Sequence, residues 1–181
     1  CALRFVDNYS YQYKKQKIYS ILVVLEGIPE VIKLIKFISK YSFKNNYKII
    51  LRTHPVLAWK KIKKLYKFVE KSNNIFVSEN EKLINDLKKA HLCIYWGSAV
   101  CLDALKCGIP LVHFNEGKYL SYDPLFELKY FKWTIQNEND LTNVINKIDN
   151  LDLIRFYEER KKAQLYINDY LHAISDKNIY K

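Results

Sequence analysis

The chain has 181 residues, 49% of them hydrophobic, which is enough for one substantial core and too little for two full-sized α/β domains. Its 30 Lys and Arg against 19 Asp and Glu give a net charge of +11 and imply an anionic partner: nucleotide, phospholipid surface or nucleic acid. No apolar run approaches the roughly 20 residues that span a bilayer, and no signal-peptide pattern is visible, so we expect a soluble, cytoplasmic protein.

The start of the chain suggests a tether. The sequence begins with Cys1 and contains no Met, so we expect a piece of a longer polypeptide whose partner domain is missing. The stretch from Asp7 to Lys17 is polar and rich in Tyr. We therefore predict that residues 1–19 link a preceding N-terminal domain to a single domain formed by residues 20–181.

The four cysteines do not suggest a metal site. Cys1, Cys93, Cys101 and Cys107 form no CxxC pair, and no His lies at metal-ligand spacing from them. Three of them lie in apolar surroundings, where a reduced, buried thiol is the ordinary state in a cytosolic protein. We expect no bound metal and no cofactor.

Short apolar runs alternate with segments of helical periodicity along the chain. The first run, 21–25, is continuous and rich in branched side chains, and it ends at the turn 26–29, as a buried strand does. The predicted strands are 21–25, 47–51, 75–77, 92–95, 109–114 and 131–135. The predicted helices are 30–38, 57–68, 80–87, 98–108, 140–148 and 152–173. The segment 116–123 is predicted as a loop.

This alternation predicts the fold class. Strands that are apolar on both faces and separated by helices form a parallel sheet covered on both sides, and right-handed crossovers make it doubly wound. We expect a Rossmann-like α/β domain with a sheet of about six strands, closed by a long C-terminal helix. In such a sheet ligands bind beyond the carboxyl ends of the strands.

The first polar cluster, Arg52-Thr53-His54-Pro55, follows the second predicted strand. Arg can fork onto a phosphate, His can donate a hydrogen bond to one, and Pro55 fixes the turn that presents them. The alternative is a loop histidine that caps its own backbone.

The second cluster, Trp96-Gly97-Ser98-Ala99, follows the fourth predicted strand and opens a helix. Backbone N–H groups at a helix start attract anions, and Gly97 lets a phosphate approach the main chain closely. Ser98 adds a hydroxyl, and Trp96 could stack on a base or a sugar. Ser98 is equally suited to be an N-cap, a role that is compatible with phosphate binding.

Two further acidic positions complete the candidate set. Asp103 lies one and a half turns into the same helix, where it either accepts ribose hydroxyls or is a surface acid. Glu26-Gly27 follows the first strand, and the small residue again permits close approach. The fingerprints GxxxxGK[ST] and GxGxxG are both absent, which argues against a P-loop NTPase or a standard dehydrogenase.

The order of these motifs resembles a known family. An Arg-x-His-Pro turn, a Gly-Ser helix start, an acidic residue and the run Ala104–Pro110 (ALKCGIP) occur in this order along a βα repeat. They resemble the C-terminal domain of GT-B glycosyltransferases, with closest similarity to bacterial enzymes of surface polysaccharide synthesis: capsule Kdo transferases, sialyl- and polysialyltransferases, and CDP-glycerol polymerases. The resemblance covers residues 21–115, and the segment 157–171 is similar to the closing helix of such domains.

The resemblance implies a role for each motif. His54 and Pro55 would contact the nucleotide or its phosphate, Gly97 and Ser98 would cradle phosphate, and Asp103 would hold the ribose or the donor. Many relatives have Glu at the position of Asp103 and a Ser or Thr at that of Gly97, and these departures are consistent with a different donor or with a weakened site.

The resemblance also implies the reaction. The donor would be a CMP-, CDP- or UDP-activated sugar, and the acceptor a saccharide or lipid-linked group. Transfer would be inverting and independent of metal, because helix starts and basic side chains neutralise the leaving phosphate. The general base would come from the N-terminal domain, so catalytic residues within this chain are unknown. Such enzymes work in bacterial capsule or surface carbohydrate synthesis, and the positive charge would favour contact with the anionic inner membrane.

Three alternatives remain open at this point. A non-hydrolysing sugar-nucleotide epimerase has the same architecture but usually carries more acidic residues after the Gly-Ser helix start. A non-enzymatic nucleic-acid-binding domain would explain the basic charge, but the basic residues are dispersed and no recognised motif is present, so we expect no nucleic acid as a partner. A degenerate domain could act as a scaffold for an active partner.

Overall fold

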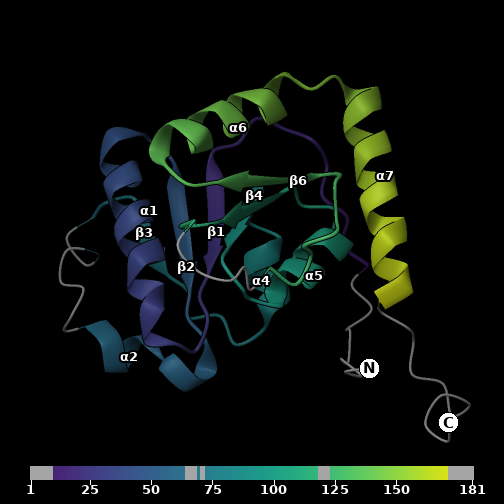
Figure 1. The fold of residues 1–181 in the computed structure, drawn as a ribbon. Helices are drawn as coiled ribbons and strands as arrows, with labels where there is room; N and C mark the ends of the chain where they lie inside the picture. The colour runs from purple at the N-terminus through teal and green to yellow at the C-terminus, as the bar shows by residue number, and fades with distance from the viewer. Residues whose placement is uncertain (1–9, 64–68, 70–71, 118–122, 171–181) are drawn as a thin grey trace, which may run out of the picture.

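A single sheet of six parallel strands, in the order β3-β2-β1-β4-β5-β6, organises the molecule (Figure 1). The computed structural model describes residues 10–63, 69, 72–117 and 123–170. The strands are β1 Ser20–Val24, β2 Lys48–Arg52, β3 Ile75–Val77, β4 Leu92–Tyr95, β5 Leu111–Phe114 and β6 Lys132–Ile135. This arrangement confirms the predicted doubly wound α/β fold.

The central strands are apolar because both of their faces are covered. All five residues of β1 and all four of β4 and of β5 are buried, whereas the outer strands β3 and β6 are partly exposed. β1 lies between β2 and β4, with Val24 level with Arg52 on one side and with Tyr95 on the other. The last residues of three strands therefore end at the same edge of the sheet.

Helices cover both faces of the sheet. On one face Phe37 of α1 packs on Phe114 of β5, with ring centroids 4.8 Å apart, and Tyr41 of α1 shares a hydrogen bond with Thr142 of α6. On the other face α5 packs on β4 and against α7 (Figure 1). The α-helices are α1 Ile32–Lys44, α2 Trp59–Ile62, α4 Leu83–Leu87, α5 Val100–Lys106, α6 Glu138–Asn150 and α7 Leu153–Tyr170, and the 3₁₀ helices are η1 Pro29–Val31 and η2 Pro55–Leu57. Within the described part of the chain, every helix is too short or too polar to cross a bilayer.

The observed helices differ from the predicted ones at both ends, and α1, predicted over 30–38, spans Ile32–Lys44. The predicted helix 57–68 is η2 followed by α2, and its portion 64–68 lies outside the described residues. The helix expected from Asn80 begins at Leu83, because the preceding loop is held by side-chain hydrogen bonds to Asp86 instead of continuing the helix. Residues 118–122 of the predicted loop and 171–173 of the predicted last helix also lie outside the described residues.

The N-terminal segment 10–19, predicted as part of a tether, packs on the domain. Tyr13 is 1% exposed, and its backbone N–H donates to the Cys107 carbonyl at 2.7 Å. The Ile18 N–H donates to the Asp149 carboxylate at 2.9 Å, and Arg160 of α7 donates to the Tyr13 carbonyl at 2.9 Å. The segment from residue 10 therefore joins the same core as the sheet. Residues 1–9 lie outside the described part of the chain.

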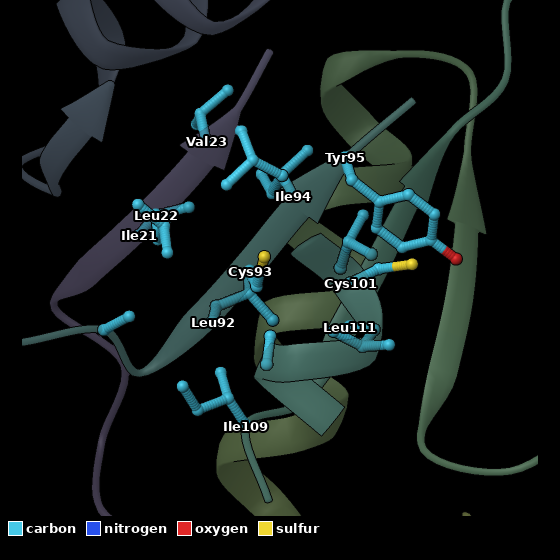
Figure 2. Packing of buried hydrophobic residues seen from close by; sticks show 14 of the residues in the cluster. Ile21, Leu22, Val23, Leu92, Cys93, Ile94, Tyr95, Cys101, Ile109 and Leu111 are labelled. Carbon is cyan, nitrogen blue, oxygen red and sulfur yellow. The ribbon is translucent and has the colours of Figure 1, made fainter. Parts of the chain in front are cut away.

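The core lies between the sheet and its helices. Figure 2 shows side chains of β1 and β4 lying beside one another, with Cys101 of α5 next to Tyr95. Cys93, Cys101 and Cys107 are fully buried free thiols. Burial raises the pKa of Cys107 to about 12 and that of Cys93 further, so both thiols stay protonated. The expectation of buried, reduced cysteines is thus met for these three residues.

Replacement of Gly108 by Ala is expected to destabilise the fold. Gly108 ends α5 with φ +74°, and a Cβ there would lie 2.7 Å from Cδ of Arg160, which is anchored to the Tyr13 carbonyl. Gly117 has the same φ, but a Cβ there would meet only the Gln136 side chain, at 3.5 Å. Both substitutions incur about 1 kcal/mol of backbone strain, and Gly108→Ala adds a steric clash.

Urea unfolding should therefore show a larger loss of stability for Gly108→Ala than for Gly117→Ala, by about 1 kcal/mol or more. Equal losses in the two variants would show that Arg160 does not restrict this turn.

Candidate functional site

The order of strands creates a crevice between β1 and β4. The chain leaves β1 toward β2 on one side, and it leaves β4 toward β5 on the other, so the two connections diverge at this point of the sheet. Ligands of open α/β sheets bind at this reversal, outside the carboxyl ends of the strands. The segments that follow β1, β2 and β4 here are 25–28, 53–55 and 96–99, which are the three clusters predicted from the sequence.

A cavity of about 270 Å³ lies at these strand ends. It brings His54, from the turn after β2, together with Ser98, from the turn after β4. Pro55, Ala99 and Arg52, which were also among the candidate site residues, line it as well. The full lining is Val24, Leu25, Arg52, Thr53, His54, Pro55, Leu83, Ser98, Ala99 and Val100.

His54 is exposed and its orientation is fixed by its own turn. Its Nδ1 accepts a hydrogen bond from the Val56 N–H at 3.2 Å, which is the backbone cap considered as the alternative to ligand binding. Because Nδ1 is an acceptor, the proton of the neutral ring sits on Nε2, which makes Nε2 a donor. The cap therefore prepares the imidazole to donate a hydrogen bond to an anion.

Gly27 allows close packing at the crevice. A Cβ on Gly27 would lie 2.9 Å from Nδ1 of His54, so the imidazole rests directly against this backbone. Gly97 is partly buried, and Ser98 is 8% exposed with its Oγ accepting from the Val100 N–H at 3.4 Å. Ser98 thus contacts the first amide of α5 while it lines the cavity, and the N-cap position itself is Ala99.

Glu26 lies across the crevice from the turn after β4. Its Oε1 accepts a hydrogen bond from the Gly97 N–H at 2.5 Å, and its Oε2 is buried with no hydrogen-bond partner. Burial raises the pKa of this carboxyl above its ordinary value, although the backbone groups of Gly97, Ser98 and Trp96 act to lower it. The sequence placed Glu26 at the site but did not indicate this contact.

Arg52 lines the cavity, but its guanidinium is held by the protein. It donates to the Asp86 carboxylate at 2.5 Å and to the carbonyls of Asn80 and Glu81 at 2.9 and 3.0 Å. Asp86 is fully buried and also accepts from Ser78 Oγ at 2.7 Å and Asn80 Nδ2 at 2.6 Å. Arg52 therefore fixes one wall of the cavity and is not oriented by the structure as a free phosphate ligand.

Trp96 and Asp103 lie away from the cavity. Trp96 is 6% exposed and packs edge-to-face on Phe114, with ring centroids 6.1 Å apart. Asp103 is 5% exposed and is close enough to Cys93 and Cys107 to raise the pKa of both thiols. The indole is thus a core group, and the carboxylate is neither at the crevice nor on the surface.

A buried polar cluster that the sequence did not indicate joins β4, β5 and β6. The Asp123 carboxylate accepts from Tyr95 Oη at 2.7 Å and from Lys132 Nζ at 2.6 Å, and His113 Nδ1 lies 3.8 Å from it. Burial alone would raise the pKa of Asp123, but the Lys132 ammonium and the Tyr95 hydroxyl lower it below its ordinary value. The cluster ties the loop after β5 to the sheet.

A second cavity of about 360 Å³ lies at the opposite, amino edge of the sheet, lined by Lys17, Ile18, Tyr19, Asn45, Asn46 and Tyr47. Its size does not make it the better candidate, because ligands of this fold class bind at the carboxyl edge. Among the described residues, no three His, Cys, Asp or Glu side chains gather as a metal site.

Comparison with known proteins identifies the fold. The sequence matches no protein-family model and no curated protein sequence. The structure is similar to TarM, with a TM-score of 0.61 and 19% identity over 93% of this chain. It is also similar to the catalytic domain of cholesterol-α-glucosyltransferase from Helicobacter pylori, with a TM-score of 0.57 and 19% identity over 84% of this chain and 99% of that chain. A UDP-GlcNAc 2-epimerase from Methanocaldococcus jannaschii, in complex with UDP-GlcNAc and UDP, matches with a TM-score of 0.57 and 14% identity over 85% of this chain.

These matches confirm the predicted fold, because the chain shares its doubly wound α/β fold with TarM, the cholesterol glucosyltransferase and the epimerase. The chain spans 35% of the length of TarM and 45% of the epimerase, so it corresponds to under half of these proteins.

Replacement of Asp86 by Asn is expected to loosen the cavity wall. The variant removes the charge that pairs with Arg52 in a buried setting and should reduce the free energy of unfolding by about 2–3 kcal/mol. Glu81→Gln is the matched control, because the Glu81 side chain is exposed and only its carbonyl contacts Arg52. Urea denaturation of both variants measures the difference, and a loss below about 0.5 kcal/mol in Asp86→Asn would contradict a structural role for the pair.

Proposed function

We propose that the chain is the donor-binding half of a glycosyltransferase, which holds a nucleotide-activated sugar in the crevice between β1 and β4. The observation that carries this proposal is the shared cavity of His54 and Ser98, two residues that lie 44 positions apart in the sequence and were predicted together as phosphate contacts. The fold supports the proposal, since the glycosyltransferases that match it share this domain.

In this proposal the crevice supplies hydrogen-bond donors to the phosphates. His54 donates from Nε2 and Ser98 donates from its hydroxyl, and both residues line the cavity. Pro55 holds the turn that presents His54. The hydrophobic residues of the lining, Val24, Leu25 and Leu83, leave room for the apolar face of a base or sugar.

The finer assignment follows the family resemblance. We propose a CMP-, CDP- or UDP-activated donor and an inverting, metal-independent transfer to a saccharide or lipid-linked acceptor in bacterial surface carbohydrate synthesis. The net charge of +11 supports peripheral contact with an anionic membrane on the cytoplasmic side.

A second domain would complete the enzyme. We propose an N-terminal GT-B domain that precedes residue 10, covers the crevice and supplies the general base. Two observations support it: the chain spans only 35% of TarM, and the apolar residues Ile28 and Val56 next to the crevice are 38% and 65% exposed.

A sugar-nucleotide epimerase is the second candidate. The match to the epimerase that was solved with UDP-GlcNAc and UDP favours it, since the TM-score of 0.57 equals that of the cholesterol glucosyltransferase. Incubation with UDP-GlcNAc followed by product analysis discriminates between the two: an epimerised nucleotide sugar would replace transfer as the proposed reaction.

Replacement of His54 by Ala is expected to weaken nucleotide binding. Loss of a hydrogen bond to a charged phosphate costs about 1.5–3 kcal/mol, which corresponds to roughly tenfold to a hundredfold in Kd. Calorimetric titration of the chain with CMP, CDP and UDP measures the effect for each base. His54→Gln, which retains an N–H donor, should recover part of the affinity.

Lys48→Ala is the matched control for charge, because Lys48 lies at the amino end of β2, on the edge of the sheet opposite to His54. It should bind like the wild type. If no nucleotide binds at millimolar concentration, or if His54→Ala binds as tightly as the wild type, the proposed function is wrong.

A further inference from the structure

The carboxylate of Glu26 occupies backbone donors of the turn after β4, the turn that also carries Ser98. Its Oε1 accepts from the Gly97 N–H at 2.5 Å, and the backbone groups of Trp96 and Ser98 also stabilise its ionised form. Ser98 lines the cavity in which the proposed phosphates bind. The protein thus places its own anion beside the position assigned to the ligand's anion.

The second oxygen of this carboxylate is poorly suited to carry charge. Oε2 is buried and has no hydrogen-bond partner. A buried carboxylate oxygen without a donor is costly when it is ionised, but a protonated carboxyl can place its proton on that oxygen. Burial accordingly raises the pKa of Glu26, against the lowering effect of the backbone donors.

Among the residues that the structure describes, no cation is found to stabilise this charge. Every interaction that shifts the Glu26 pKa, apart from burial, comes from the backbone of residues 26 and 96–98. Lys33 of α1 pairs with Glu116 at 2.5 Å, and Arg52 of β2 pairs with Asp86. His54 rests against Gly27 with its Nδ1 held by the Val56 N–H.

We propose that Glu26 makes nucleotide binding proton-coupled: a ligand phosphate enters the crevice as the Glu26 carboxylate takes up one proton from solvent. This inference rests on the proposed function. Two negative groups that share one set of donors cannot both remain ionised at low cost, so binding of the phosphate raises the affinity of Glu26 for a proton. The proton binds to the carboxylate, and no other bond is made or broken.

The sign of the pH dependence follows from linkage. The pKa of Glu26 is higher in the complex than in the free protein, so the affinity for the nucleotide rises as the pH falls between these two values. Within that window the affinity changes by up to about tenfold per pH unit. At pH values above the pKa of Glu26 in the complex, or below its pKa in the free protein, Glu26 does not change the affinity for the nucleotide with pH.

Calorimetry of CMP binding tests this coupling. Titrations at one pH, in two buffers of different ionisation enthalpy, give the number of protons taken up per ligand, and a pH series from 5 to 8 locates the window. The variant Glu26→Gln retains an oxygen that can accept from Gly97 but cannot ionise. Glu30→Gln is the matched control, because Glu30 is exposed and follows four positions later, in η1.

We expect the wild type and Glu30→Gln to take up protons on CMP binding within the window, and Glu26→Gln to take up fewer. At the upper end of the window, Glu26→Gln should bind CMP at least about tenfold more tightly than the wild type. The comparison between variants cancels the titration of the CMP phosphate, because the same ligand is used with each. Thermal unfolding verifies that each variant is folded.

Other results would overturn the inference. If Glu26→Gln binds CMP no more tightly and with unchanged proton uptake, Glu26 is only a structural cap of the turn after β4, while the proposed function survives. If Glu26→Gln fails to fold, proton uptake by the wild-type protein still tests the inference. CMP binding by the wild type without proton uptake across the pH series excludes the coupling. If neither protein binds any nucleotide, the proposed function and this inference fail together.

Discussion

The reversal of strand order between β1 and β4 is the constraint on which the candidate site depends. Because the chain diverges at this point, the connections that leave the two strands cannot cover the carboxyl edge between them, and a crevice remains. The burial of β1 and β4 on both faces fixes their register, so Val24 and Tyr95 end at the same level. Polar residues just beyond these strands are therefore brought together whatever their separation in sequence.

Two of the charged groups around the crevice, Arg52 and Glu26, are bound within the protein, and the His54 imidazole is exposed. Arg52 is bound to Asp86, which anchors the loop before α4 and shapes one wall of the cavity. Glu26 is bound to the backbone after β4. The imidazole of His54 is capped on one nitrogen and exposed, which leaves it suited to contact a ligand. The site therefore combines a rigid scaffold with a donor whose orientation is set in advance.

Much of the fold could be predicted from the sequence because the buried strands have a simple pattern. Continuous apolar runs such as 92–95 and helical spacing such as that of 32–38 reflect burial directly, so the six strands were predicted within a few residues of their observed bounds. The sequence also predicted that His54 and Ser98 lie near the same cavity, because parallel strands place the turns that follow them at one edge of the sheet.

Side-chain directions could not be predicted in the same way. Arg52 and Asp86 are 34 positions apart, and no local pattern shows that they pair, so Arg52 resembled a free phosphate ligand. Trp96 belongs to the core because Phe114 of β5 lies beneath it, a contact that only the sheet order creates. Asp103 is buried by the packing of α5, and Tyr13 is buried by contacts with α5 and α7 that a polar, Tyr-rich segment does not indicate.

The central claim is that a nucleotide binds at the carboxyl edge of the sheet, between the turns after β2 and β4. An NMR titration of the ¹⁵N-labelled chain with CMP, CDP or UDP tests it most directly. The account predicts that amide shifts concentrate in residues 26–27, 52–56 and 96–100. Shifts concentrated in residues 17–19 and 45–47, at the amino-edge cavity, or no shifts at millimolar nucleotide, would contradict it.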